Sequence, residues 1–360
     1  MALPDTWQGP LFVVGASRSG TTMLRSILNR APEIQLAGET HYFDDLRPRF
    51  DGRALSGMSA EEQAVCADYF RSQSIRPYGV RANPEESPLS RDDLLGPAAA
   101  VDGPTRDSVD AVFETYCRWH MSQAGARIWG EKTPRHIFRI DDILAAYPEA
   151  RILCTVRDPR AVVASYRDWE YQGGLRKAEG NADYQAAIAE DQKRKETSYH
   201  IVIASMMWRA AARAAFAAQA KHSTDRVRVV RYEDVVGAPA DTVRPIAEWL
   251  GVGYDDSLLE IPLHNSSTTR FDEKAGPSAA PNRRWHKVLS PQEIAIIQRV
   301  AGKALDDAGY AREPVKAGPL DLLAAYASLP GVVVRAARAN RSRYTSLPAY
   351  VMRRLKAALG

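Results

Sequence analysis

Cysteine is scarce in this sequence. The three residues present, Cys66, Cys117 and Cys154, are odd in number and far apart, so they indicate neither a disulfide framework nor a metal site. We expect each of them to be a small buried hydrophobe. Because disulfides are rare in reducing compartments, this composition favours a cytoplasmic location.

Long apolar runs are also missing from the pattern. None approaches the roughly 20 residues that a membrane-spanning helix needs, and residues 1–5 lack the basic region and apolar core of a signal peptide. With 45% hydrophobic and 26% charged residues in a chain of 360, the composition is typical of a globular protein. This length allows one large domain or two small ones.

Neither strong charge nor a metal-ligand pattern is present. The formal net charge is only +4, which suits an anionic ligand but gives no indication of nucleic acid as a partner. No cluster of His, Cys or Asp has the spacing of a metal site. We therefore expect neither a nucleic-acid partner nor a metal cofactor.

The most informative stretch is residues 11–24. Residues 11–14 are an apolar run typical of a buried strand, Gly15 and Gly20 bracket a small polar loop, and from Met23 onward the apolar residues recur on one helical face. Strand, loop and helix N-terminus together form a cradle for an anionic group. An ordinary strand–turn–helix is the alternative interpretation, since glycine-rich turns are common.

The loop lacks the lysine that a nucleotide-triphosphatase P-loop carries directly after its second glycine. Here Gly20 is followed by threonines, and the cation comes earlier, at Arg18. The segment 17–22, Ser-Arg-Ser-Gly-Thr-Thr, closely resembles the 5′-phosphosulfate loop of the sulfotransferases. The resemblance implies 3′-phosphoadenosine 5′-phosphosulfate (PAPS) as the donor. It implies that the donor is held by Arg18, Ser19, Gly20, Thr21 and Thr22.

Further segments extend this resemblance over roughly residues 10–310. In the sulfotransferases an Arg at a strand end, with a Ser eight residues later, holds the 3′-phosphate of the donor, and Arg157 and Ser165 match in type and spacing. Looser matches for donor contacts are Tyr232, Ser266 or Ser267, Arg283, Arg284 and Trp285. Trp285 is equally compatible with a position in the core.

The resemblance also implies the catalytic groups. Glu39, after the second expected strand, looks like the base of the bacterial and tyrosylprotein-like branch, which takes the acceptor proton. Lys132 resembles the lysine that stabilises the transferring group there, together with Arg18. His41 is the rival base, because the cytosolic small-molecule branch uses a histidine. The implied reaction is metal-free in-line transfer of a sulfuryl group to a hydroxyl or amine of a small molecule, sugar, lipid or peptide.

The pattern of the whole chain predicts an α/β fold of three layers, similar to P-loop proteins, with a mostly parallel central sheet. Its strands are expected at residues 11–14, 34–37, 127–130, 152–156 and 226–232. Thr133 is expected to cap a helix that runs to about residue 147, and Asp158 to cap the next helix. A capping box is expected at Ser290.

The expected main domain covers residues 1–316. Residues 43–126 read as a largely helical insertion and 167–200 as a second insertion, which includes a mobile lid, both on the substrate side. Residues 317–360 read as a basic helical extension. Its segment 347–359 has an apolar face with basic residues elsewhere, which suits either weak contact with an anionic membrane surface, at the periphery of a membrane, or packing on the main domain or a second subunit of a homodimer.

Two other functions remain open at the level of sequence. A P-loop kinase would use Asp234, after the last expected strand, to hold magnesium, but the missing lysine after Gly20 argues against it. A catalytically idle nucleotide-binding scaffold would keep the fold and lose the base or the lysine. Both Glu39 and Lys132 are present, which favours an enzyme.

Overall fold

A five-stranded parallel sheet forms the centre of the computed structural model, which describes residues 7–75, 82–167, 182–262, 276–278 and 284–339. The strand order is β2-β3-β1-β4-β5, and every neighbouring pair is parallel. The strands are β1 (Leu11–Gly15), β2 (Ile34–Ala37), β3 (Ile128–Lys132), β4 (Arg151–Val156) and β5 (Val227–Arg231). The five predicted strands and the α/β class are confirmed.

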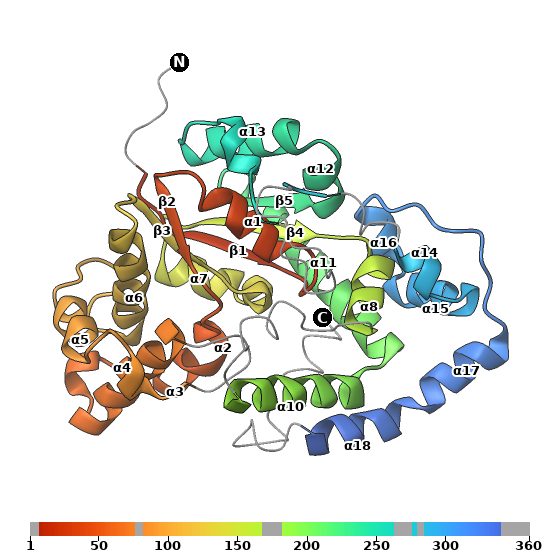
Figure 1. Ribbon diagram of the computed structural model, residues 1–360, viewed down its shortest axis with the longest axis horizontal. Helices are drawn as coiled ribbons and strands as arrows, with labels where there is room; N and C mark the ends of the chain where they lie inside the picture. Colours follow the sequence, from red (N-terminus) through yellow and green to blue (C-terminus); the bar gives the residue numbers. More distant parts are fainter. Residues whose placement is uncertain (1–6, 76–81, 168–181, 263–275, 279–283, 340–360) are drawn as a thin grey trace.

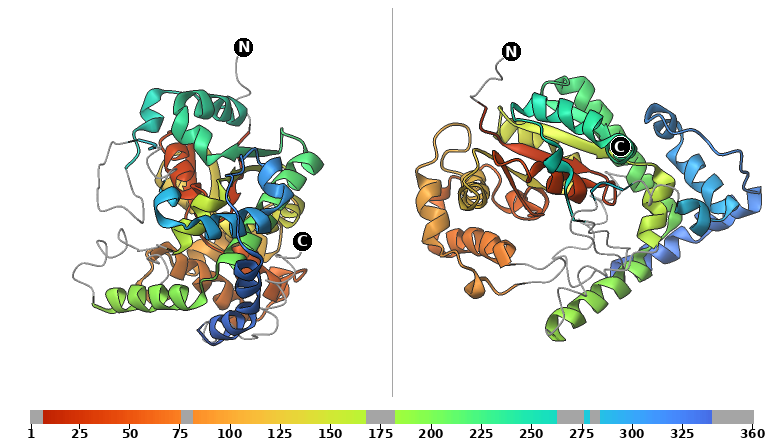
Figure 2. Two further views of the ribbon diagram at one scale, coloured as in Figure 1. Left: turned by 90° about the vertical axis from the view of Figure 1, so that its right-hand side faces the viewer. Right: turned by 45° about the horizontal axis from the view of Figure 1, so that its top comes forward.

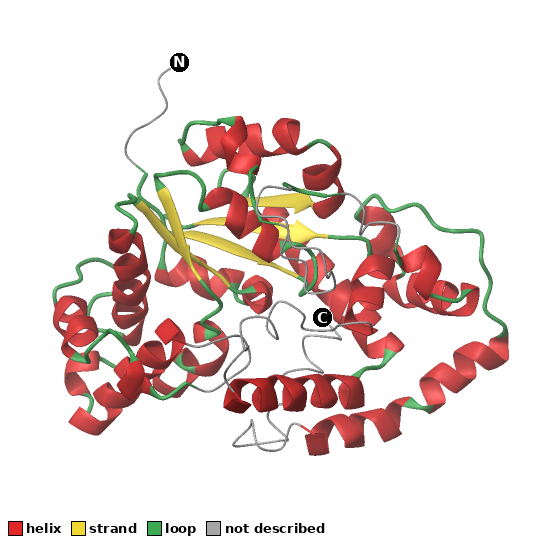
Figure 3. Ribbon diagram, in the orientation of Figure 1, coloured by secondary structure: helices red, strands yellow, loops and turns green. Residues whose placement is uncertain are grey.

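Helices cover both faces of this sheet (Figure 3). Successive residues of a strand point to opposite faces, and β1 divides accordingly. Phe12 and Val14 lie in one buried cluster with residues of α6 (Val109–Gln123), α7 (Ile140–Ala146) and α11 (Ile201–His222). Leu11 and Val13 lie in the other cluster with residues of α1 (Thr21–Leu28), α12 (Tyr232–Gly237) and α13 (Pro239–Leu250). The central strands are therefore buried on both faces, as their continuous apolar runs indicate.

The segment between β2 and β3 is helical, as predicted for residues 43–126. Its helices lie together beside the β2 end of the sheet (Figure 1). Besides α6 they are α2 (Tyr42–Asp45), α3 (Arg47–Phe50), α4 (Ala60–Ile75) and α5 (Asp92–Ala99), with short 3-10 turns at Leu55–Gly57 and Pro84–Glu86.

The second half of the chain adds the remaining helices. They are α8 (Pro159–Arg167), α10 (Ala182–Ser198), α14 (Trp285–Val288), α15 (Pro291–Ala301), α16 (Lys303–Asp307), α17 (Pro319–Ala327) and α18 (Leu329–Ala339), with a 3-10 turn at Asp256–Leu259. The predicted cap of α8 is present, because Asp158 Oδ1 accepts the Arg160 N–H at 2.8 Å. The capping box at Ser290 is also confirmed.

The single helix expected from Thr133 to about residue 147 is wrong. The structure has a 3-10 turn over Pro134–Phe138 and then α7, which begins only at Ile140. Arg139 lies between them in a non-helical conformation, and Thr133 makes no cap because its hydroxyl bonds to a buried glutamate instead. A tertiary contact therefore overrides the local capping signal.

Two helical segments in the described residues are long and apolar enough to cross a membrane, which corrects the expectation that no such run exists. They are α11, with a mean hydropathy of 1.3, and Pro319–Ala339, with 1.4. α11 is a core helix that contributes Trp208 to the main buried cluster. Pro319–Ala339 differs, because α17 and α18 run along the outside of the molecule, with α18 beside α10 (Figures 1 and 2).

Candidate active site

The loops that follow the strands meet at one edge of the sheet. In a parallel sheet all carboxyl ends lie at the same edge, which is where such folds bind ligands. The strands β1, β2, β4 and β5 are followed by the expected site residues Arg18, Glu39, Arg157 and Tyr232, and β3 ends at Lys132. The topology therefore brings together groups that are more than 100 residues apart in the chain.

The loop between β1 and α1 depends on its two glycines. Gly15 and Gly20 have φ values of 153° and 87°, the range in which a side chain is strained. A Cβ at Gly15 would also clash with Thr155 on β4, and one at Gly20 with the ring of Tyr232. The backbone of this loop is thus held closely against both neighbouring elements.

The N-terminus of α1 is open for an anion. Gly20 provides no side-chain cap, and the first turn has no acidic residue, so the first backbone N–H groups have no partner within the helix. Ser19 is fully buried, and its hydroxyl has no hydrogen-bond partner among the described residues. Thr22 is exposed beside it. These features fit a bound phosphate or sulfate group.

Arg18, Arg157, Ser165 and Tyr232 form one cluster. Arg18 Nε donates to Ser165 Oγ at 3.0 Å, and Arg157 Nη1 donates to the carbonyl oxygen of Arg18 at 3.1 Å. The Arg157 guanidinium lies 4.2 Å from the centre of the Tyr232 ring, a cation–π arrangement. The indole N–H of Trp208 donates to the Arg157 carbonyl oxygen at 2.7 Å and so holds the loop between β4 and α8 in place. Two guanidinium groups therefore lie beside the open end of α1.

Glu39 and Lys132 form an ion pair at this edge, with 2.5 Å between Oε1 and Nζ. The Lys132 side chain is 6% exposed and the Glu39 side chain 19%, so the pair is shielded but reachable. His41 Nε2 lies 3.5 Å from Glu39 Oε2. The predicted base, its rival and the predicted lysine are thus in one contact group, with Glu39 in the middle.

A buried glutamate behind this pair was not singled out in the sequence. Glu131, the neighbour of Lys132 on β3, is 0% exposed and accepts hydrogen bonds from Thr40 N at 3.0 Å and Thr40 Oγ1 at 2.9 Å. The Thr133 hydroxyl donates to the same oxygen and accepts from Thr40 N. Glu131 therefore holds the backbone of the residue directly after Glu39.

Burial governs the electrostatics of this inner layer. It raises the pKa of Glu131 to about 7, although hydrogen bonds from Thr133 and Thr40 act in the opposite direction. It lowers the pKa of His136, whose Nδ1 lies 3.5 Å from Glu131 Oε2, to about 3. A carboxyl in an otherwise apolar strand, directly before the lysine, was the available sequence signal.

The structure supports the remaining expected donor contacts less well or does not describe them. Trp285 is 4% exposed and lies in a buried cluster with Ala164 and Leu289. One face of its ring lies against the Arg160 guanidinium and the ring stacks on His286, which favours the core interpretation over an adenine platform. Arg284 directly precedes this helix. Ser266, Ser267 and Arg283 lie outside the described residues, as do residues 168–181 of the expected lid.

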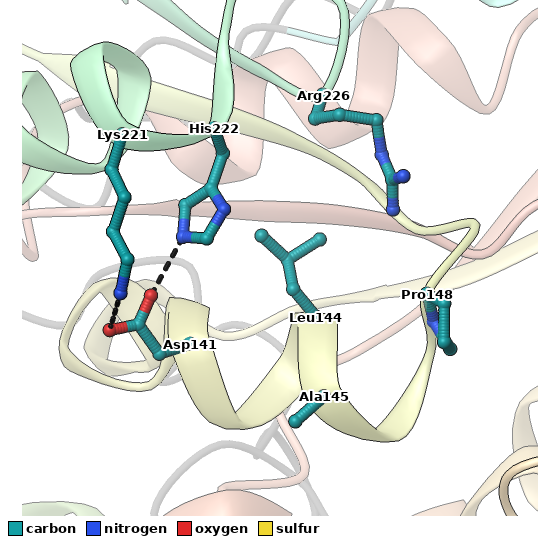
Figure 4. A pocket seen from close by; sticks show the side chains of 7 residues that line it. All are labelled: Asp141, Leu144, Ala145, Pro148, Lys221, His222 and Arg226. Atoms are coloured by element: carbon teal, nitrogen blue, oxygen red, sulfur yellow. Dashed lines mark hydrogen bonds and ion pairs between the residues drawn. The ribbon is translucent and has the colours of Figure 1, made fainter.

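A hollow of about 350 Å³ lies elsewhere on the protein (Figure 4). Pro148 and Arg226, which line it, precede β4 and β5, so the hollow is at the opposite, amino edge of the sheet. Asp141 pairs there with Lys221 at 2.8 Å and His222 at 2.7 Å. The carboxylate of Asp141 is thus already paired, and the hollow shares no residue with the Glu39 site.

The structure is an α/β protein whose carboxyl edge of the sheet has an uncapped helix N-terminus, two adjacent arginines and a carboxylate–lysine pair. A family model described as "Sulfotransferase family" matches residues 10–256, which is more than half of the chain. The chain belongs to the sulfotransferase family, and it is a transferase by that membership.

Similar proteins are distant. The nodulation protein NoeE of Sinorhizobium fredii is 28% identical over 158 residues, which are 43% of this chain and only 30% of that protein. The sulfotransferase domain of the Synechococcus PCC 7002 olefin synthase is 19% identical, with a TM-score of 0.47 over 86% of this chain and 98% of that one. Sulfotransferase STF9 of Mycobacterium avium is 17% identical, with a TM-score of 0.40 over 87% and 79%.

Proposed function

We propose that this protein transfers a sulfuryl group from PAPS to a hydroxyl or amine acceptor, with Glu39 as the base, as in the bacterial and tyrosylprotein-like branch of the family. The observation that carries the proposal is the Glu39–Lys132 ion pair at the carboxyl edge of the sheet. It lies at the same edge as the uncapped N-terminus of α1. A proton acceptor and an anion site are both needed for this reaction.

The loop and α1 are suited to the 5′ end of the donor. Backbone N–H groups at the helix start, the Thr21 and Thr22 hydroxyls and the Arg18 guanidinium can all donate to sulfate and phosphate oxygens. A sulfuryl group develops less charge than a phosphoryl group, so fixed donors of this kind can stabilise it without a metal.

Arg157 and Ser165 are suited to the 3′-phosphate of the donor. Ser165 Oγ accepts from Arg18, and a serine hydroxyl that accepts one hydrogen bond keeps its own proton for another. Arg157 offers a planar guanidinium held by Tyr232, and such a group binds phosphate through two parallel hydrogen bonds. The two residues can therefore act on one phosphate while Arg18 links them to the loop.

Glu39 would take the proton of the acceptor as its oxygen or nitrogen attacks sulfur. The sulfur–oxygen bond to the donor breaks, and adenosine 3′,5′-bisphosphate leaves. The Lys132 ammonium favours the ionised carboxylate that a base requires. It can also donate to the oxygen that acquires charge on the leaving group. His41 contacts the second oxygen of Glu39, and its proposed part is to orient that carboxylate.

The alternative functions have less support. A P-loop kinase requires a lysine after Gly20, where the chain has Thr21, and the family match is to sulfotransferases. An idle scaffold would have no reason to keep Glu39 and Lys132 in direct contact at the cradle. Neither alternative has an observation of its own in the described residues.

Thermal-shift measurements separate these functions. Adenosine 3′,5′-bisphosphate at about 100 times its dissociation constant should stabilise the protein by about 2.7 kcal/mol, whereas ATP with magnesium should have little effect. The opposite order would support the kinase. Mass spectrometry of sugars, lipids, phenols, tyrosine peptides and other metabolites incubated with PAPS then identifies the acceptor by the added sulfuryl group. Binding without transfer to any of a broad panel would favour the scaffold.

A further inference from the structure

Large apolar side chains are exposed on α17 and α18, which we call the C-terminal arm (Pro319–Ala339). Most of the exposed large hydrophobic residues in the described chain lie here, and the two on other helices or turns are Val65 and Phe138. Those of the arm are Leu320, Leu323, Tyr326, Val333 and Val334, with Leu320 76% and Leu323 65% exposed. A concentration of this kind marks an interaction surface.

One side of the arm packs on the rest of the protein, and the opposite side is exposed. Leu322, Ala325 and Leu329 pack on a buried cluster of Val202, Ile296 and Val300, from α11 and α15. Val332 is 2% exposed, and α18 lies along α10 (Figure 1). The exposed side chains are therefore those left over after the arm has made its contacts with the protein.

The charge on α18 and in the sequence beyond it has one sign. Asp321 is the last acidic residue of the chain. Every charged residue after it is basic: Arg335, Arg338, Arg341, Arg343, Arg353, Arg354 and Lys356. Arg335 and Arg338 are exposed on α18 itself, whereas the others lie outside the described residues. An apolar face next to basic side chains is the composition of a segment that lies on an anionic membrane.

We propose that the outer face of the C-terminal arm binds the surface of an anionic lipid bilayer. A second copy of the chain is a poorer occupant, because a symmetric contact would place two arms of net positive charge against each other, each with Arg335 and Arg338 against the single Asp321. Residues 340–360 are also poorer occupants of this face, because all of their charged side chains are basic. Anionic lipid headgroups complement the arginines while the acyl chains take up the leucines.

The arm is suited to lying on a bilayer rather than crossing it. Ser328 separates α17 from α18, so the apolar segment is not one uninterrupted helix. Arg335, four residues from the end of the segment, would have to enter the hydrocarbon if the segment crossed. Its inner side is also occupied by the protein. The proposal is independent of the transfer reaction, since it concerns neither Glu39 nor the donor cradle.

Co-sedimentation with vesicles tests this proposal on the full chain. Wild-type protein should bind vesicles of phosphatidylcholine and phosphatidylglycerol, lose binding in high salt, and bind pure phosphatidylcholine weakly. The double variant Leu320→Ser with Leu323→Ser should bind at least about tenfold more weakly, because it removes apolar area from the contact. Val65→Ser, at a 45% exposed residue of α4, is the matched control and should bind like wild type.

A variant that removes two positive charges provides a second, independent test of the proposal. Arg335→Gln with Arg338→Gln should reduce binding to the anionic vesicles by roughly thirtyfold, since each basic residue near such a surface contributes roughly fivefold. Lys303→Gln, at an exposed lysine of α16, is the control. Circular dichroism and the melting temperature confirm that each variant is folded.

Three results would overturn the proposal. If wild-type protein does not bind anionic vesicles, the outer face of the arm is not a membrane-binding surface. Sedimentation velocity that shows a dimer in wild type and a monomer in Leu320→Ser with Leu323→Ser would assign the face to a second copy. Vesicle binding that resists alkaline carbonate would mean that the segment inserts instead of lying on the surface. In each case the donor-binding measurements stay interpretable, so the two proposals fail separately.

Discussion

The sheet edge and the C-terminal arm depart from the usual distribution of side chains in opposite ways. At the edge, charged residues are buried: Glu131 is 0% exposed and Lys132 4%. On the arm, Leu320 and Leu323 are largely exposed. Burying a charge costs free energy unless it is paired, and exposing leucine forgoes the gain from burial.

The two regions differ in whether other residues of the protein offset the cost of these unusual positions. At the edge the two buried charged side chains have partners, because Thr40 donates to Glu131 Oε1 and Glu39 pairs with Lys132. The exposed leucines of the arm have no comparable compensation among the described residues. We infer that the first region is organised for chemistry, where fixed groups are an advantage, and the second for association.

The largest expected effect is at the proton acceptor. Glu39→Gln keeps the shape of the side chain but removes the base, so turnover of the identified acceptor should fall by about 10²- to 10⁴-fold. Binding of adenosine 3′,5′-bisphosphate should be unchanged. His41→Ala is the matched control, with a much smaller loss. Near-normal turnover in Glu39→Gln together with a large loss in His41→Ala would make the histidine the base.

A pair of leucines compares the interior with the arm directly. Leu250→Ala, at a fully buried residue of α13, should lower the free energy of unfolding by about 2–5 kcal/mol. Leu323→Ala makes the same chemical change at an exposed position, and should alter it by less than about 0.5 kcal/mol. Denaturant titration measures both. A large loss in Leu323→Ala would show that the arm face is covered by the rest of the chain.

The inner layer of the site predicts a pH effect on stability. Burial in the fold raises the pKa of Glu131 to about 7 from its usual 4.5, so the folded state binds more protons than the unfolded state between these values. It lowers the pKa of His136 to about 3 from 6.5, so there the unfolded state binds more. The two contributions oppose one another between pH 4.5 and 6.5.

Glu131→Gln removes one of these contributions. The stability of this variant relative to wild type should therefore increase with pH from 4.5 to 7, by up to about 1.4 kcal/mol per pH unit. Chemical denaturation over this pH range, with both proteins in the same buffers, gives the difference curve. A flat difference would mean that Glu131 titrates as an ordinary carboxyl group.

The features that could be predicted from the sequence are those encoded over short stretches. The run from Leu11 to Gly15, the glycine at 20 and the helix that follows are local patterns, and the structure has all three. Glu39, Lys132 and Arg157 lie at strand ends, and parallel topology alone brings strand ends to one edge. Asp158 and Ser290 cap their helices because the capping contacts span only two or three residues.

The features that could not be predicted depend on distant partners. Thr133 has the sequence signature of a cap, but its hydroxyl bonds to Glu131, and both bind Thr40, more than 90 residues away. Ser165 Oγ accepts a hydrogen bond from Arg18, which is 147 residues away. The apolar arm was missed because its leucines and valines are interrupted by Asp321, Ser328 and Arg335, and exposure is visible only in the folded chain.

The most direct test of the proposed donor site is calorimetric titration with adenosine 3′,5′-bisphosphate and with adenosine 5′-monophosphate, which lacks the 3′-phosphate. Wild-type protein should prefer the bisphosphate by roughly ten- to a hundredfold, since hydrogen bonds to charged groups contribute about 1.5–3 kcal/mol. Arg157→Ala, which leaves Glu39 and Lys132 in place, should lose most of that preference. Equal binding of the two nucleotides by wild type, or an undiminished preference in Arg157→Ala, would contradict the donor site described for this sheet edge.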